Sequence, residues 1–180
     1  MHPLPARPAI GVDSPLARLS ACHARIARRC TGLRRLSAHL SARAADARAR
    51  TVAAGLLQFF DSAVANHHAD EEQHLFPALI ESMAGSDAVC LRELVAGLTA
   101  DHRQLEALWR RVRPGLARIA TGESSALACA CVEALANACE RHIEREEREL
   151  LPMAARLIDD GELARMGRAM HARRVIDGIA

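Results

Sequence analysis

The sequence predicts an all-α protein folded as an antiparallel up-down four-helix bundle with a short additional helix at its C-terminus. Apolar residues recur at intervals of three and four through most of the chain, which is the spacing of one helix face. Tyr is absent and Phe and Trp together number four, whereas Ala and Leu are abundant, and this composition favours helices over strands. Pro, Gly and small polar residues occur between the apolar stripes, where helix ends are expected.

The first two helices are predicted from their ends. Ser14 followed by Pro15 is typical of a helix N-terminus and predicts a helix over about residues 15–40. A second helix should begin near Ala44, bend at Pro77 because proline lacks a backbone N–H, and end near Met83. The residues expected to face inward on these two helices are Leu16, Leu19, His23, Ile26, Cys30, Leu33, Leu36, Val52, Leu56, Phe59, Phe60, Val64 and His67.

The third helix is predicted between two glycine signals. The Gly-Ser-Asp sequence at 85–87 combines a stop with a cap, and Gly122 ends the helix after a bend at Pro114. Its inward stripe consists of Leu91, Leu94, Leu98, His102, Leu105 and Trp109.

A fourth helix should start at Ser124 or Ser125 and continue slightly beyond Pro152. Its inward residues are Leu127, Cys131, Leu135, Cys139, His142 and Glu146. A short fifth helix over about residues 162–174 follows the Asp-Asp-Gly sequence at 159–161.

The chain of 180 residues is long enough for one sizeable core, and we expect a single bundle domain over residues 14–158. Residues 1–13 should be flexible and residues 159–180 should form a helical tail. The N-terminal residues contain no apolar run of seven, so they predict neither a secretory signal nor a membrane span, and we expect a cytoplasmic protein. A formal charge of only +2 argues against nucleic-acid or membrane partners.

An eleven-residue pattern occurs twice, at 67–77 and 142–152. Each copy begins with His, has Glu four and five residues later, Leu at eight and Pro at ten. With residue usage of roughly 5% per type, the two Glu and the Pro would recur after a second His by chance about once in 10^4 trials. The pattern is therefore a repeat.

The repeat has the geometry of a metal site. Residues four apart lie on one helix face, so each copy directs an imidazole and a carboxylate the same way. Each copy also follows a His on the preceding helix, 44 residues earlier in one case and 40 in the other. In an up-down bundle the four His can lie at similar depth. The converging set is His23, His67, Glu71, His102, His142 and Glu146.

Four imidazoles and two carboxylates in a bundle core suit a first-row transition metal. Buried ionised carboxylates are costly unless they are paired or bound to metal, and two cations bridged by Glu71 and Glu146 would compensate them.

These motifs, with Leu-Phe-Pro after the first pair and Asp-His on the third helix, resemble the hemerythrin-like (HHE cation-binding) domain over roughly residues 14–155. The resemblance implies a left-twisted four-helix bundle holding two iron ions with a bridging oxo or hydroxo group. It implies that the six converging residues are the ligands and that the two Glu bridge. It also implies a small diatomic ligand or peroxide as the partner.

The chain departs from oxygen-carrying hemerythrins on the third helix. Those proteins have a second His one turn after the first, where this chain has Glu106. Glu106 lies one turn after His102 and should reach the metal, which changes the charge and the open coordination position. Sensing or redox roles therefore gain weight over reversible oxygen carriage.

Both repeats carry further polar residues near the predicted ligands. His74 returns to the face of His67, and His68 precedes Glu71 by three residues, so both are possible additional ligands or neighbours of the site. Glu72 and Glu147 lie about 140° from their motif His around the helix axis, and we expect them to pair with Arg.

A ferritin-like di-iron site would need Glu-x-x-His on two helices, and only residues 71–74 have that spacing. Three functional hypotheses remain. The first is a hemerythrin-like protein that binds or senses oxygen, nitric oxide, peroxide or iron. The second is a small di-iron redox enzyme, or an iron-centre repair protein, acting on peroxide or nitric oxide. The third is a metal-free helical interaction module.

Overall fold

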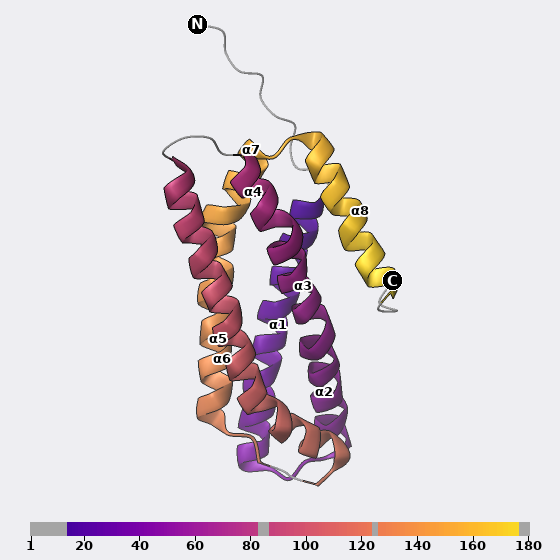
Figure 1. Cartoon of the computed structure of the whole chain (residues 1–180). Helices are drawn as coiled ribbons and strands as arrows, with labels where there is room; N and C mark the ends of the chain where they lie inside the picture. The colour runs from indigo at the N-terminus through magenta and orange to yellow at the C-terminus, as the bar shows by residue number, and fades with distance from the viewer. Residues whose placement is uncertain (1–13, 83–86, 124–125, 177–180) are drawn as a thin grey trace, which may run out of the picture.

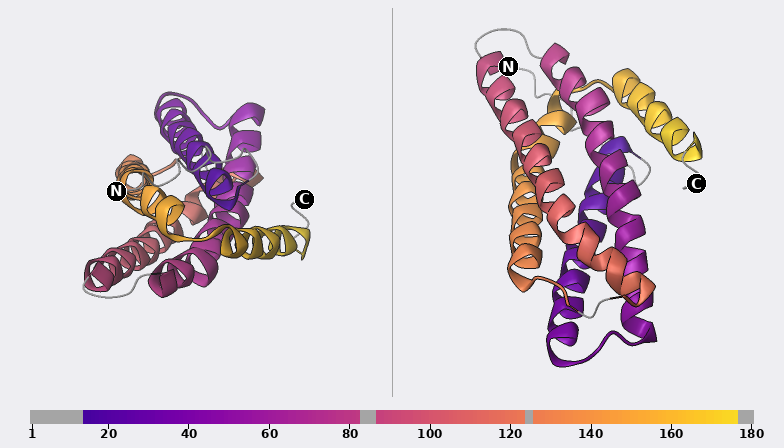
Figure 2. Two further views of the ribbon diagram at one scale, coloured as in Figure 1. Left: turned by 90° about the horizontal axis from the view of Figure 1, so that it is seen from above. Right: turned by 60° about the horizontal axis from the view of Figure 1, so that its bottom comes forward.

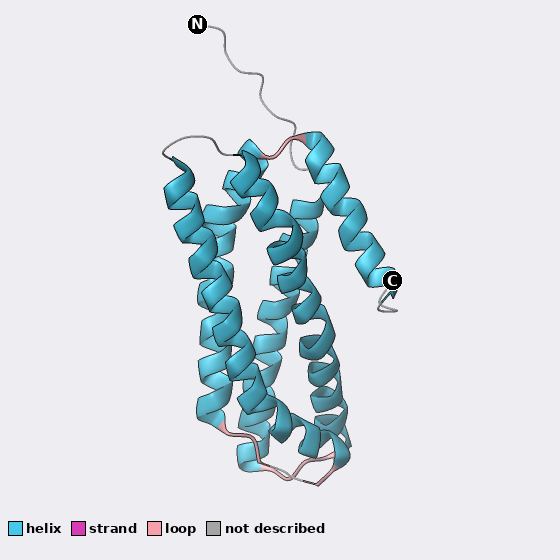
Figure 3. Ribbon diagram, viewed as in Figure 1, coloured by secondary structure: helices cyan, strands magenta, loops and turns pink. Residues whose placement is uncertain are grey.

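The computed structural model describes residues 14–82, 87–123 and 126–176, and within these ranges it contains helices and loops but no strand (Figure 3). Five helical runs follow one another along the chain. The first three are α1 (Pro15–Ala42), then α2 (Ala47–Gln58), η1 (Phe59–Val64), α3 (Ala65–Asp70), η2 (Glu71–Leu75) and α4 (Phe76–Ser82) as one run, and α5 (Asp87–Thr121). The last two are α6 (Cys129–Arg145) with η3 (Glu146–Leu150) and α7 (Leu151–Leu157), and α8 (Asp160–Ile176).

The first four runs form the predicted up-down bundle. Helix α1 packs against α2 and α6, and α5 packs against the same two helices, so each run lies beside the next and the fourth closes on the first (Figures 1 and 2). Helix α8 folds back outside the bundle, where it contacts α1 and α3 (Figure 1). The predicted fold class is confirmed, and no described helix is long and apolar enough to cross a membrane.

Several predicted helix ends are confirmed. The hydroxyl of Ser14 accepts a hydrogen bond of 3.1 Å from the backbone N–H of Ala17 and caps α1. Helix α5 ends at Thr121, and Gly122 follows with a φ of 80°, a conformation that glycine adopts without steric cost. The predicted end at Met83 and the signals at Gly85 and Ser86 lie outside the described residues.

The start of the second run differs from the prediction. The run begins at Ala47 rather than Ala44 because Asp46 is the cap, and its carboxylate accepts a 2.7 Å hydrogen bond from the N–H of Ala49. Helix α8 is longer than predicted, because Asp159 accepts a 2.9 Å hydrogen bond from the N–H of Glu162 and sets its start.

The fourth run also begins later than predicted, at Cys129, and the expected caps Ser124 and Ser125 lie outside the described residues. Ala128 is extended rather than helical. This loop lets Leu127 pack onto α5 beside Gly115, where the absence of a side chain leaves room. Tertiary packing therefore outweighs the local helix propensity of these residues.

The two copies of the repeat contain matching short π-helices, in which the backbone hydrogen bonds run five residues back instead of four. Helix η2 starts at Glu71 and η3 starts at Glu146, and the hydrogen bonds that close them run from Phe76 to Glu71 and from Leu151 to Glu146. Each π-helix ends two residues before the proline of its repeat, whose missing N–H already interrupts the normal ladder of hydrogen bonds. Single wide turns of this kind occur often at functional sites.

The interior is divided into two apolar clusters with polar residues between them. One cluster fills the end of the bundle near the α1–α2 loop, and the other fills the end where α7 and α8 meet. Leu19 belongs to the second cluster and Cys22 to the first, so His23 lies at the boundary. The bundle therefore positions one polar layer at mid-height.

Candidate metal centre

The polar layer consists mainly of the residues predicted to bind metal. Among the described residues, eight polar or charged side chains are buried. Six of these are the predicted ligands His23, His67, Glu71, His102, His142 and Glu146. The other two are Ser37 and Asp70.

One half of the cluster brings together His23 from α1, His67 from α3 and the two Glu. The Nε2 atom of His67 lies 3.3 Å from Oε1 of Glu71. The Nε2 atom of His23 lies 3.7 Å from the same oxygen and 3.0 Å from Oε2 of Glu146. The ligand atoms of these four residues all lie within 4.8 Å of one another, which is close enough for one ion.

The other half brings together His102 from α5 and His142 from α6 with the same two Glu. The Nε2 atom of His102 lies 3.3 Å from Oε2 of Glu71, and the Nε2 atom of His142 lies 3.3 Å from Oε2 of Glu146. Each Glu is therefore shared by both halves, and Glu71 directs one oxygen toward each. This is the arrangement that two bridged ions require.

The nitrogen and oxygen atoms that would bind metal have no hydrogen-bond partners in the cluster. Among the described residues, the Nε2 atoms of the four ligand His and both oxygens of Glu71 and Glu146 are buried in this way. Buried polar atoms are nearly always satisfied, and burying a carboxylate without compensation is strongly unfavourable. Bound cations would satisfy all of these atoms at once, so the residues fit a metal centre.

The electrostatics of the cluster lead to the same conclusion. Burial, followed by the charge of Glu146, raises the pKa of Glu71 well above its ordinary value. Burial lowers the pKa of His23, but the carboxylates of Glu146 and Glu71 outweigh it and raise that pKa to about 11. The metal-free cluster therefore retains protons that cations would replace.

The remaining His of the predicted ligand set are held in the neutral form, which is the form of imidazole that binds metal. Burial, and then the neighbouring His142 and Arg103, lowers the pKa of His102 to about 3. Burial is also the largest cause of the lowered pKa of His67 and His142.

Two carboxylates outside the cluster orient its imidazoles. The Nδ1–H of His23 donates a 2.6 Å hydrogen bond to Oε1 of Glu147, and the Nδ1–H of His102 donates a 2.8 Å hydrogen bond to Oε1 of Glu72. Glu72 also pairs with Arg103. Such contacts fix the tautomer and ring orientation of metal-binding histidines.

This role was not predicted from the sequence. Glu72 has the expected arginine partner, but for Glu147 the structure shows a histidine instead. The helical phase correctly directs both side chains away from their own motif His. Because the neighbouring helices present His23 and His102 on that side, the two Glu reach histidines of the same site.

The possible additional ligands are placed differently from one another. His68 lies near the second half of the cluster, since one ring nitrogen of each of His68, His102 and His142 lies within 4.8 Å of the others. The ring of His68 stacks on that of His102, with 3.9 Å between the ring centroids. His74 is only partly buried. Among the described residues, it belongs to none of the groups whose ligand atoms lie within 4.8 Å of one another. His74 lies within the π-helix η2, whose hydrogen bonding departs from the α-helical geometry that the placement of His74 on the face of His67 assumes.

Glu106 is likewise absent from the described metal-binding groups. It is exposed and lines a cavity beside the cluster. That Glu106 reaches the metal stays a prediction, and its exposure argues for a place outside the ligand set.

The comparisons with known proteins agree with this geometry. The family model of the hemerythrin HHE cation-binding domain matches residues 14–154. The chain belongs to this family. It is also similar to an uncharacterized protein of Haemophilus influenzae, with 26% identity over 164 residues that cover 91% of this chain and 92% of that protein. Membership of the family and the buried His and Glu groups together indicate a metal-binding protein.

Proposed function

We propose that this hemerythrin-like protein holds two iron ions and binds or senses a small oxidant such as oxygen, nitric oxide or peroxide. The observation that carries the proposal is the sharing of Glu71 and Glu146 between two groups of ligand atoms. Each group contributes two imidazoles and carboxylate oxygen. Two His and one carboxylate with open positions is the ligand set typical of non-haem iron.

The individual residues have distinct roles in this proposal. His23 and His67 hold one ion, His102 and His142 hold the other, and the two Glu bridge. His68 adds an imidazole at the second ion, in place of the one that Glu106 does not supply. When bound, the ions would supply reversible electron transfer and an open position for a small ligand.

The test is the metal content of the purified chain. We expect about two iron ions per chain after anaerobic loading with ferrous iron, and a coloured protein after exposure to air. Because metal binds the assembled ligands and not the unfolded chain, loading should raise the melting temperature. The expected stabilisation is about 2.7 kcal/mol for each ion at a free metal concentration 100 times its Kd.

Matched variants localise the site. Glu71→Ala and Glu146→Ala should each severely reduce iron content, because each removes a ligand shared by both groups. Glu140→Ala is the control, since Glu140 is an exposed residue of α6 that pairs with Arg34. Uptake of a single zinc ion with no uptake of iron under reducing conditions would contradict the proposal, as would equal iron content in all three variants.

A further inference from the structure

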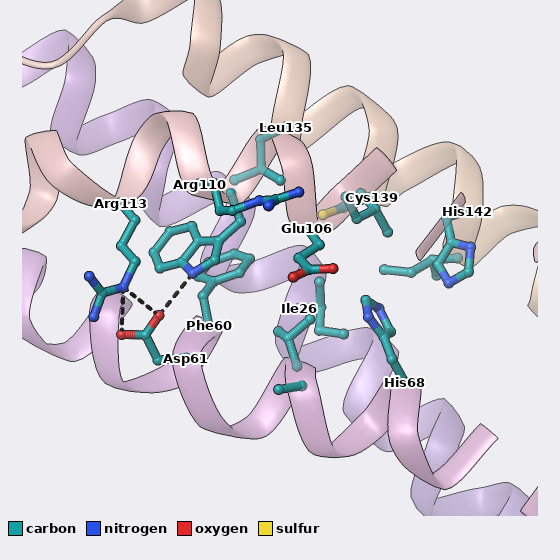
Figure 4. A pocket seen from close by; sticks show the side chains of 15 residues that line it. Ile26, Phe60, Asp61, His68, Glu106, Arg110, Arg113, Leu135, Cys139 and His142 are labelled. Atoms are coloured by element: carbon teal, nitrogen blue, oxygen red, sulfur yellow. Dashed lines mark hydrogen bonds and ion pairs between the residues drawn. The ribbon is translucent and has the colours of Figure 1, made fainter. Parts of the chain in front are cut away.

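A cavity of about 260 Å³ lies between α1, the second helical run, α5 and α6, directly beside the cluster of His and Glu side chains (Figure 4). Its walls are mostly apolar, and the residues that form them include Phe60, Val64, Leu105, Trp109, Leu135 and Ile143. The proposed small oxidants need only a fraction of this space, because one water molecule occupies about 30 Å³ in the liquid.

The size and lining of the cavity suit an organic molecule. An apolar cavity of about 150 Å³ accepts benzene, so a volume of 260 Å³ accommodates about ten non-hydrogen atoms. Apolar walls favour an apolar body, because each polar or charged group moved there would lose its hydration without replacement.

One end of the cavity is polar. His68 and His142 lie there, and both contribute to the group of imidazole nitrogens at the second half of the cluster (Figure 4). The Nε2 atom of His142 is among the buried atoms without a hydrogen-bond partner. A ligand oxygen at this end would therefore meet imidazole nitrogens in the metal-free protein, and the second ion in the loaded protein.

The charged residues of the cavity favour an uncharged ligand. At the opposite end, Asp61 and Arg113 form an ion pair of 2.9 Å and neutralise each other (Figure 4). Glu106 and Arg110 also line the cavity, but both are exposed and carry opposite charges. The formal charges of these four residues sum to zero.

We propose that this cavity binds an uncharged organic molecule with an apolar body and a single oxygen-bearing group, of the alcohol class, with the oxygen directed toward His68 and His142. The cavity itself is formed by the protein alone. Only the contact between the ligand oxygen and the second ion rests on the proposed function.

The protein contains its own probe for this ligand. Trp109 is the only tryptophan of the chain, tyrosine is absent, and Trp109 lines the cavity, so the intrinsic emission reports on this place alone. Cyclohexylmethanol fits the volume and does not absorb where tryptophan is excited. Cyclohexanecarboxylate and cyclohexylmethylamine have nearly the same body with a negative and a positive charge.

The experiment titrates the full chain, metal-free and iron-loaded, with each of the three compounds. We expect a saturable change in Trp109 emission with the alcohol, and binding at least about tenfold weaker for both charged compounds. Ala65→Leu should abolish the change, because the exposed Ala65 lines the cavity and a larger side chain would fill it. Ala54→Leu, on the exposed face of α2 and outside this cavity, should bind as the parent does.

The outcomes separate this inference from the proposed function. A saturable alcohol response in a chain that takes up no iron would support the cavity ligand and contradict the di-iron proposal. Iron uptake without any alcohol response in either form would overturn the cavity ligand alone. Equal affinity for the charged compounds, or an Ala65→Leu variant that folds and binds as the parent does, would also overturn it.

Discussion

The Nδ1 atom of His23 lies 2.6 Å from Oε1 of Glu147, and the equivalent contact in the other half of the site joins His102 to Glu72. Each copy of the repeat therefore supplies a Glu that lies between the two halves of the site and, as the next residue, an acceptor for the histidine of a neighbouring helix. Two adjacent Glu have two roles in one site.

The first prediction concerns these acceptors. Glu72→Ala and Glu147→Ala should lower iron affinity by about 10- to 100-fold, because the orienting partner of a ligand histidine is lost. The corresponding Gln variants should recover part of that loss, since an amide oxygen still accepts the Nδ1–H. Metal titration followed by the iron absorption spectrum measures the effect. Glu133→Ala, which removes a half-exposed partner of Arg34, is the control and should bind iron as the parent does.

The second prediction separates His68 from His74. His68→Ala should lower the affinity for one of the two ions by at least about tenfold, because it removes an imidazole beside His102 and His142. His74→Ala should retain both ions. Competition with a chelator during stepwise loading distinguishes the two ions, and identical curves for both variants would exclude His68 as a ligand.

The third prediction concerns Glu106. Glu106→Gln should keep two ions per chain and an unchanged optical spectrum, because Glu106 is exposed and outside the described ligand groups. The sequence alone predicted the opposite. A shifted spectrum would place its carboxylate beside the metal after all.

The fourth prediction concerns the tail helix. Arg173 of α8 donates a 2.9 Å hydrogen bond from Nε to Asp70, whose side chain is only 1% exposed. Arg173→Ala should lower the free energy of unfolding by about 2 kcal/mol, because it removes the cation facing a buried carboxylate. Arg165→Ala on the same helix should cost less than about 0.5 kcal/mol, since Arg165 is exposed and its partner Glu162 is partly exposed. Urea denaturation of both variants measures the difference.

The fifth prediction concerns pH. Burial raises the pKa of Asp61, but hydrogen bonds from Arg113 and Trp109 outweigh it and hold the pKa below the ordinary value of 3.8. The ionised form is thus favoured by folding, so this stabilisation is present above about pH 4 and is lost as the pH falls through the lower folded value.

Asp61→Asn should therefore destabilise the protein by about 1 kcal/mol at pH 7, a value discounted because the carboxylate is partly exposed. The difference from the parent should shrink as the pH falls below about 4 and through the lower folded pKa of Asp61. Urea denaturation at both pH values measures it, and Glu93→Gln, an exposed change on α5, is the control. A difference that does not depend on pH would assign the effect to packing.

The sequence predicted the bundle because its information is local and periodic. Helices are specified by nearby residues alone. The signals are apolar residues spaced three and four apart, the N-terminal cap Ser14 and the helix-ending Gly122. The burial and convergence of the six predicted ligands were also predictable, since His67 to Glu71 and His142 to Glu146 depend only on spacing within one helix. That they bind metal stays a prediction. The extent of the domain, residues 14–158, stays a prediction.

What could not be predicted depends on contacts between helices. The partner of Glu147 is set by the rotation of α1 relative to η3, which no spacing within the chain encodes. His74 lies in the π-helix η2, where the number of residues per turn differs from that of an α-helix, so spacing from His67 does not give the direction of its side chain. The start of α6 is set by Leu127 packing on α5. Each of these failures is an effect of tertiary structure on a local rule.

The separation of the interior into two apolar clusters has a consequence for cooperativity. The clusters meet at a layer of facing carboxylates and imidazoles, so little apolar contact couples one end of the bundle to the other there. Cations in that layer would bind all four helices at one height and join the two ends into one folding unit. Without them, we expect the two ends to open separately, so amide exchange should reveal two protected regions where the loaded protein has one.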